Sequence, residues 1–144
     1  MAEAVRRAGV RAAVATGWGG IAPDVESRDV LVIDQAPHDR LFPDMAAVVH
    51  HGGSGTTGAA LAAGRPQVVC PFVADQPHWA VRMHAVGVAP APLRQQDLTA
   101  DRPATRLVHV IGDPGVRERA ELIGVRVRAE NGVQAAVNAL EHVL

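Results

Sequence analysis

The sequence has few of the residues that mark secreted, membrane or nucleic-acid-binding proteins. Its 144 residues include no tyrosine, one cysteine and two tryptophans, and the formal net charge is −1. One cysteine allows no internal disulfide, and a near-neutral charge argues against a general nucleic-acid partner. There is no apolar run of about 18 residues to cross a membrane, and arginines interrupt the first segment where a signal peptide needs an apolar stretch. We expect one cytoplasmic domain covering residues 1–144.

Short apolar runs alternate with helical segments, which predicts an α/β fold built on a doubly wound, Rossmann-like parallel sheet. With so few aromatic residues, the core must be made of alanine, valine and leucine. A doubly wound domain usually opens on a strand, whereas this chain opens on a helix, so we expect either that the first strand is missing or that the domain began as part of something longer. The predicted strands are 11–15, 29–33, 46–49, 67–70 and 88–93; the predicted helices are 2–8, 59–63, 76–85, 99–111, 114–129 and 133–143, with one helical turn at 41–42.

Four loops with small or polar residues follow predicted strands, at 16–20, 34–38, 50–58 and 71–76. The carboxyl ends of parallel strands meet at one edge of the sheet, where α/β proteins bind their ligands. The sequence therefore predicts a binding site made by these loops together.

The glycine-rich run 50–58 precedes a helix, and such a turn presents free N–H groups to an anion, most often phosphate. It contains the pattern G-x-G-x-x-G, which also permits a dehydrogenase that binds NAD. The run has no lysine, which argues against a P-loop. Its two adjacent histidines stand at a strand end, where neighbouring side chains point in opposite directions, and this disfavours a metal site. His51 is favoured as a phosphate ligand, while His50 is equally compatible with packing and with ligand binding.

Several other residues can have a purely structural role, in packing or helix capping, instead of a functional one. Cys70, in a predicted core strand, is expected to be a packed thiol. Asp75 can be a helix N-cap, Trp18 can pack within its own loop, and Trp79 and Met83, four apart on one helix, are expected in the core.

Residues 50–80 read HHGGSGTTGAALAAGRPQVVCPFVADQPHWA, preceded by VIDQAPHDRLFP at 32–43 and ATGWGG at 15–20. The combination closely resembles the C-terminal nucleotide-sugar domain of GT-B family 1 glycosyltransferases, of the sterol 3-beta-glucosyltransferase and antibiotic-aglycone types. The resemblance covers about residues 11–143. It implies the C-terminal half of a GT-B fold.

The resemblance also implies a donor site for a UDP- or TDP-sugar, with no metal and no other cofactor. The diphosphate would lie on the turn from Gly53 to Thr56 beside His51, Asp75 and Gln76 would read the sugar, and the 35–38 loop would border the base. The donor-binding residues implied are Trp18, Gln35, Ala36, Pro37, His38, His51, Gly53, Ser54, Gly55, Thr56, Asp75 and Gln76.

The resemblance implies that the acceptor domain, which normally supplies the catalytic base, lies outside this sequence. We therefore expect no catalytic residue here, and a truncated chain that binds donor but does not transfer a hexose to a lipid, sterol or natural-product hydroxyl by itself. Three alternatives stay open: a non-catalytic subunit that needs a separate N-terminal chain, a dehydrogenase, and an inert fragment.

Overall fold

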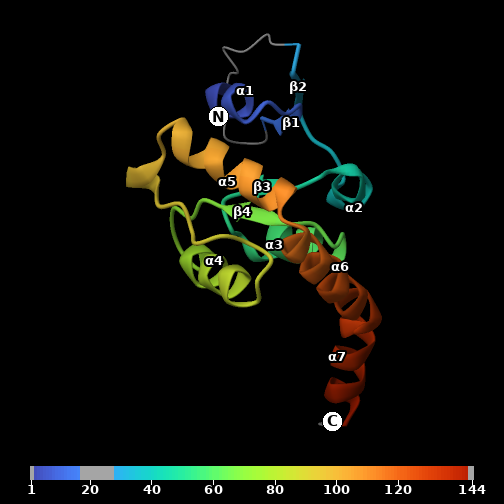
Figure 1. Ribbon diagram of the computed structural model, residues 1–144. Helices are drawn as coiled ribbons and strands as arrows, with labels where there is room; N and C mark the ends of the chain where they lie inside the picture. Colours follow the sequence, from blue (N-terminus) through green and yellow to red (C-terminus); the bar gives the residue numbers. More distant parts are fainter. Residues whose placement is uncertain (1, 17–27, 143–144) are drawn as a thin grey trace.

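The computed structural model describes residues 2–16 and 28–142 (Figure 1). Helices and short strands alternate through the first two-thirds of that part, and helices make up the rest. In chain order the elements are α1 (Ala2–Ala8), β1 (Ala12–Ala15), β2 (Val30–Ile33), α2 (His38–Leu41), the 3-10 turn η2 (Phe42–Asp44), β3 (Val48–His50), α3 (Ser54–Ala62), β4 (Gln67–Val69), α4 (Gln76–Ala85), the 3-10 turn η3 (Gln95–Asp97), α5 (Asp101–Gly112), α6 (Pro114–Ala129) and α7 (Gly132–Glu141).

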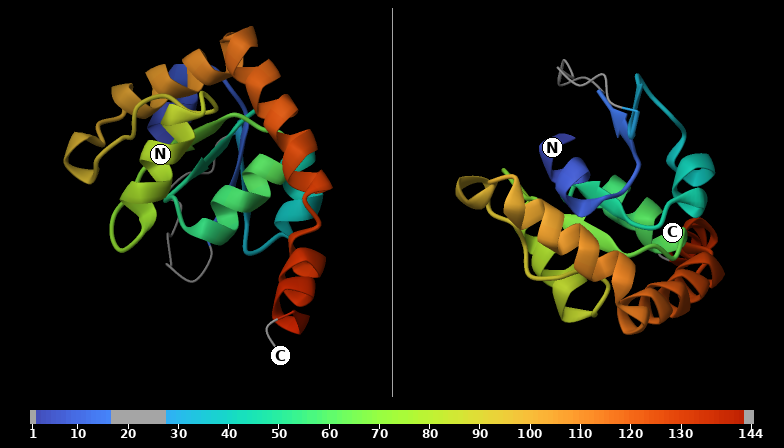
Figure 2. Two further views of the ribbon diagram at one scale, coloured as in Figure 1. Left: turned by 90° about the horizontal axis from the view of Figure 1, so that it is seen from below. Right: turned by 45° about the horizontal axis from the view of Figure 1, so that its top comes forward.

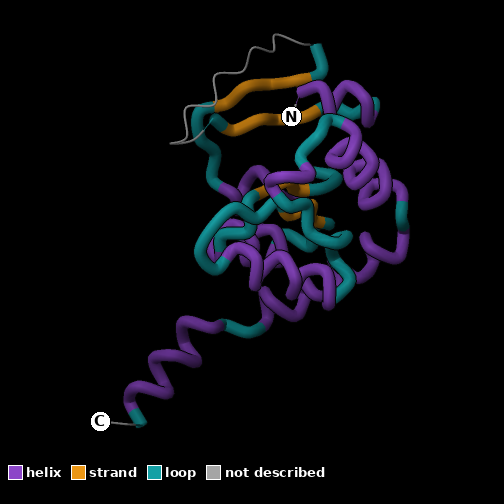
Figure 3. The backbone as a smooth tube through the Cα atoms, turned by 90° about the vertical axis from the view of Figure 1, so that its left-hand side faces the viewer, coloured by secondary structure: helices purple, strands orange, loops and turns teal. Residues whose placement is uncertain are grey.

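The strands are all parallel to their partners, and the predicted α/β class is confirmed. β1 pairs with β2, with Ala12 opposite Val30, and β3 pairs with β4, with Val48 opposite Gln67. Within the described residues these are two separate pairs rather than the single continuous sheet that was predicted. Figure 3 shows the two pairs as distinct units, with the helices gathered mainly around β3 and β4.

The core surrounds β4, whose three residues are all buried. One cluster joins Val69 to Ala80 and Met83 of α4, and a second joins Val68 to Leu107 of α5. Figure 2 shows α3, α4 and α5 packed around this pair of strands. The core position predicted for Met83 is confirmed, while Trp79 is only partly buried.

Cys70 follows β4 and is buried. Burial raises the pKa of its thiol to about 11, because the interior disfavours the thiolate. The thiol therefore stays protonated at neutral pH, and the packed role predicted for Cys70 is confirmed.

The β1–β2 pair is less covered than its apolar sequence predicts. Leu31 is 65 % exposed and Val32 is 37 % exposed, and every β1 residue keeps some contact with solvent. A run of apolar residues predicts a strand suited to a covered sheet. The apolar run 11–15 therefore predicts a buried strand, and this expectation is wrong: in the described part of the chain the cover over β1 and β2 is incomplete.

Residues 88–93 were predicted to be a strand and are not one. The segment does lie along the outer edge of β4, because the Gln67 N–H donates to the Val88 carbonyl and the Leu93 N–H donates to the Val69 carbonyl. Between these two bonds stand Pro90 and Pro92, which have no N–H to continue the ladder.

The starts of two predicted helices differ in how they are capped. The helix predicted at 114–129 is α6, and Asp113 caps it, since its Oδ1 accepts from the Gly115 N–H at 2.8 Å and from the Val116 N–H at 3.4 Å. The helix predicted at 99–111 is α5, which begins at Asp101 after Ala100 and has no side-chain cap.

The last helix, α7, extends away from the rest of the fold (Figures 1 and 3). None of its residues is buried, and Val133 is 80 % exposed. No helix among residues 2–16 and 28–142 is both long enough and apolar enough to span a membrane.

The end of α3 and the middle of α6 meet at two glycines. A Cβ at Gly124 would lie 2.7 Å from the Gly64 Cα and 2.9 Å from the Leu61 carbonyl oxygen. Gly64 itself has a φ of +68°, which an L side chain rarely adopts. The α3–α6 contact therefore depends on the absence of both side chains.

We predict that Gly124→Ala destabilises the fold by about 3 kcal/mol, because the backbones of α3 and α6 must separate to admit the methyl group. Gly112→Ala is the matched control, since a Cβ there meets nothing within 4 Å and alanine favours the helix. Urea unfolding of both variants measures the difference. Equal midpoints for the two would contradict the glycine contact.

Candidate functional site

The end of β3 is held by a buried histidine. His50 is 8 % exposed, and its Nε2 lies 2.8 Å from the Gln67 Oε1 on β4. The Gly52 N–H donates to its Nδ1 at 3.0 Å. Because Nδ1 accepts, Nε2 carries the proton and donates to Gln67. Of the two roles left open for His50, the structure supports packing.

Gly52 makes the turn after β3. Its φ is +92°, and a Cβ there would lie 2.9 Å from the Val69 Cγ1 and 3.1 Å from the Gln76 carbonyl oxygen. This glycine is thus required by packing against β4 and the start of α4, not by a ligand. Sequence reasoning assigned the glycines of this run to ligand approach and missed this role, as it missed Gln67, whose polar side chain in an apolar strand is a signal for a buried partner.

The glycine-rich segment is mostly helical. α3 begins at Ser54, five residues before the helix predicted at 59–63, with Gly53 in the N-cap position. The first helical bond runs from the Thr57 N–H to the Gly53 carbonyl. The N–H groups of Ser54, Gly55 and Thr56 therefore have no partner within the helix. A Cβ at Gly55 would meet nothing within 4 Å, so this end of the helix is open.

His51 lies against this helix end. Its side chain is exposed, and its Nε2 would be 2.6 Å from a Cβ placed on Gly53. The imidazole therefore sits beside the Gly53 Cα at the positive end of the α3 dipole. Free N–H groups and an imidazole at one point can bind an anion such as phosphate.

A cavity of about 680 Å³ lies between the two strand pairs. It is bordered by β1 and β3, by the loop after β2, and by His51 and Thr56 at the start of α3. His38 also stacks on Phe42, with ring centroids 4.4 Å apart. Five of the predicted donor residues line this cavity, namely Gln35, Ala36, His38, His51 and Thr56.

The remaining predicted residues fall into three groups. Gly53, Ser54 and Gly55 form the helix start next to Thr56, and Pro37 precedes His38 in the N-cap position of α2. Asp75 and Gln76 are not among the residues that line the cavity. Trp18 lies outside the described residues.

Asp75 and Gln76 stand at the start of α4, with the Gln76 backbone beside Gly52. Asp75 occupies the N-cap position, but its side chain does not cap the helix; Oδ2 accepts from the Trp79 Nε1–H at 2.8 Å. Gln76 Oε1 accepts from the N–H groups of Phe72 at 2.9 Å and Val73 at 3.1 Å. In the described part of the chain, Asp75 Oδ1 and Gln76 Nε2 have no protein partner.

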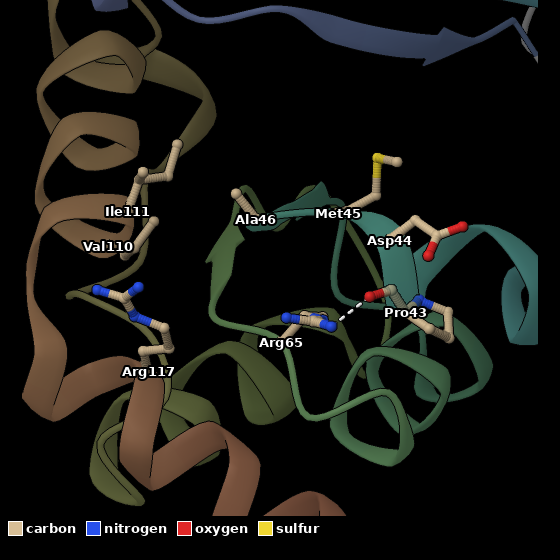
Figure 4. Close-up of a pocket in the computed structure, with 8 residues that line it drawn as sticks. All are labelled: Pro43, Asp44, Met45, Ala46, Arg65, Val110, Ile111 and Arg117. Carbon is tan, nitrogen blue, oxygen red and sulfur yellow. Dashed lines mark hydrogen bonds between the residues drawn. The ribbon is translucent and has the colours of Figure 1, made fainter.

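A second, smaller pocket of about 300 Å³ lies at the other end of β3. Figure 4 shows Arg65 and Arg117 facing it, with Arg65 donating to the Pro43 carbonyl. Met45 and Ala46, which precede β3, line it, and none of the predicted donor residues does. The candidate site is therefore the cavity at the His51 end.

Comparison with known proteins gives consistent matches. The chain is 40 % identical over 138 residues to sterol 3-beta-glucosyltransferase UGT80A2 of Arabidopsis thaliana, covering 95 % of this chain and 22 % of that protein. The glycotransferase of kitacinnamycin superposes with a TM-score of 0.85 at 26 % identity, over 99 % of this chain and 38 % of that one. Spinosyn rhamnosyltransferase SpnG complexed with thymidine diphosphate superposes with a TM-score of 0.83 at 26 % identity, over 97 % of this chain and 40 % of that one.

These matches place the chain in the GT-B class of glycosyltransferases, as the C-terminal half of that fold. Residues 21–141 match the family described as erythromycin biosynthesis protein CIII-like, C-terminal domain, and the chain belongs to this family. It spans less than a quarter of the length of UGT80A2.

The buried His50 predicts a specific pH dependence of stability. Burial lowers its pKa from 6.5 to about 4, although the bond to Gln67 opposes the shift. Between pH 6.5 and about 4 the unfolded chain binds a proton that the folded chain does not, so stability falls as pH falls through this window. The expected loss is about 3 kcal/mol, and this contribution is constant above the window.

Urea unfolding at pH 7.5 and at pH 4.5 measures this loss. His50→Gln is the control, because it removes the titrating ring and with it this part of the pH dependence. The assignment is wrong if the variant loses as much stability on acidification as the native chain does.

Proposed function

We propose that this chain is the donor-binding part of an inverting glycosyltransferase. The donor is a UDP- or TDP-sugar, and the acceptor is a hydroxyl of a lipid, sterol or natural-product aglycone. The observation that carries the proposal is the open N-terminus of α3 with His51 beside it, both facing a cavity of about 680 Å³. The names of the relatives, and the thymidine diphosphate bound to SpnG, support the choice of donor.

In this proposal the diphosphate binds at the start of α3. The free N–H groups of Ser54, Gly55 and Thr56 donate to its oxygens, as do the hydroxyls of Ser54 and Thr56. His51 donates a ring N–H to the same group. These donors stabilise the negative charge that develops on the nucleoside diphosphate as the sugar–oxygen bond breaks. The proposal assigns no metal to this step.

Two further parts of the site are assigned to the sugar and the base. Asp75 Oδ1 accepts from sugar hydroxyls and Gln76 Nε2 donates to them, and both atoms are free of protein partners in the described residues. Asp75 Oδ2 accepts from the Trp79 Nε1–H, and Gln76 Oε1 accepts from the N–H groups of residues 72 and 73. These bonds fix the side chains of Asp75 and Gln76 in place. The base lies against the 35–38 loop, of which Gln35, Ala36 and His38 line the cavity.

The acceptor site and the catalytic base are assigned to residues outside this chain. The expected reaction is a direct displacement at the anomeric carbon by an acceptor hydroxyl. The chain alone binds donor and transfers no sugar. Its share of the UGT80A2 length, 22 %, is consistent with a partial active site.

Isothermal titration with UDP, TDP and NAD tests the proposal. We expect UDP or TDP to bind, and His51→Ala to weaken binding about tenfold, which corresponds to one charge-assisted hydrogen bond of about 1.4 kcal/mol. His142→Ala is the matched control, because His142 follows α7, its Nδ1 lies 2.6 Å from the Asn138 carbonyl oxygen, and it is not among the residues that line the cavity. Binding of NAD alone, or equal affinity of the His51 and His142 variants, would overturn the proposed donor site.

A further inference from the structure

Two arginines face the smaller pocket, the one at the start of β3 (Figure 4). Arg65 stands between α3 and β4, and Arg117 stands in the first turn of α6. The fold therefore brings to one pocket two positive charges that lie far apart in the sequence. Such an arrangement is costly by itself and becomes favourable when an anion lies between the two charges.

Arg65 is fixed in place but is not neutralised. Its side chain is half-buried, and its guanidinium group donates to the Pro43 carbonyl. Its Nε–H is buried and has no hydrogen-bond partner in the described part of the chain. A carbonyl oxygen carries only a partial charge, so the full charge of Arg65 lacks a counter-charge. Leaving a partly buried cation unpaired costs free energy, which an anion in the pocket would recover.

Arg117 is free to bind a ligand. It is exposed, and among residues 2–16 and 28–142 its side chain makes no hydrogen bond or ion pair. Arg7 and Arg94 show the contrasting case, because each of them pairs with a carboxylate. Both pocket arginines thus keep donor groups and charge for a partner outside the described residues.

The charges around the pocket select an anion with a single charge. Asp44 also lines the pocket, and Figure 4 shows its carboxylate on the far side of the pocket from Arg117. Two guanidinium groups and one carboxylate leave one net positive charge. The nearby end of α5, at Gly112, adds partial negative charge from its last carbonyl groups. This balance favours a monoanion over a phosphate dianion.

The rest of the pocket wall is apolar. It consists of Met45 and Ala46, which precede β3, and of Val110 and Ile111 near the end of α5. The pocket measures about 300 Å³, and at roughly 30 Å³ for each non-hydrogen atom it holds about ten such atoms. An apolar wall with a few charged groups is typical of small-molecule sites of this size. The ligand that fits therefore has an apolar part and one charged end.

We propose that this pocket binds a small aliphatic monocarboxylate. The carboxylate lies between Arg65 and Arg117, and the aliphatic chain lies against Val110 and Ile111. A planar carboxylate accepts two parallel hydrogen bonds from a guanidinium group, which makes it a better match than a spherical anion. The inference is independent of the nucleotide proposed for the His51 end of β3, because none of the donor residues lines this pocket.

Other ligands fit this pocket less well. Inorganic phosphate would leave the apolar wall exposed to water and would bring a second negative charge close to Asp44. A neutral aliphatic molecule would cover the wall but would leave both guanidinium groups without a counter-charge. Only a ligand with both features satisfies Arg65, Arg117 and the wall together.

The test titrates the ¹⁵N-labelled chain with octanoate, which has the size the pocket admits. 1-Octanol, which has the same chain without charge, and inorganic phosphate, which has charge without a chain, are titrated separately. We expect millimolar octanoate to shift the side-chain Nε–H signals of Arg65 and Arg117. The affinity for 1-octanol and for phosphate is expected to be at least tenfold lower.

Arg117→Ala is expected to weaken octanoate binding about tenfold, because one charge-assisted pair is lost. Arg126→Ala is the matched control, since Arg126 is also an exposed arginine of α6 but does not line the pocket. Equal loss in the two variants, equal affinity for octanoate and 1-octanol, or tighter binding of phosphate would overturn the proposal. So would octanoate shifts confined to Ser54 and Gly55 at the other end of β3, or no binding at millimolar octanoate.

Discussion

The hydrogen-bonded imidazole of His50 connects the elements that form the site. It joins β3 to β4 through Gln67 and holds the turn after β3 through the Gly52 N–H. Because that turn is fixed, α3 starts at Ser54 with its free N–H groups directed outward, and His51 is presented beside Gly53. The bond depends on a neutral ring, and burial keeps it neutral by lowering the pKa to about 4. The proposed anion site is therefore supported from within the core.

The glycines of this chain serve two different purposes, and the structure separates them. Gly52 and Gly64 have positive φ and no room for a side chain, so they fix the chain path near β4, α4 and α6. Gly55 faces open space at the start of α3, where a ligand can approach the backbone. One glycine-rich segment thus carries both a packing constraint at Gly52 and an open helix end at Gly55.

Local signals in the sequence were enough to place most elements. The helices predicted at 76–85 and 114–129 match α4 and α6, because prolines near their first residues and a glycine after the first of them are signals carried by neighbouring residues alone. The family resemblance implied one donor site that joins His51 and Thr56 to the 35–38 loop, and His51, Thr56, Gln35, Ala36 and His38 line one cavity.

The features that the sequence did not predict depend on contacts between segments that are far apart in the chain or on an unusual loop conformation. The exposure of Leu31 and the division of the strands into two pairs depend on which segments are available to cover or join them. The bonds of Asp75 to Trp79, and of Gln76 to the 72–73 backbone, depend on a loop in which Ala74 has a φ of +58°. No pattern in the sequence marks that conformation for an alanine.

The measurement that tests the central claim most directly is an NMR titration of the ¹⁵N-labelled chain with TDP and, separately, with thymidine. The account predicts large amide shifts at Ser54, Gly55 and Thr56 with TDP and much smaller ones with thymidine, because only TDP carries the diphosphate. Equal shifts with both ligands, or shifts confined to the Arg65–Arg117 pocket at the other end of β3, would contradict it.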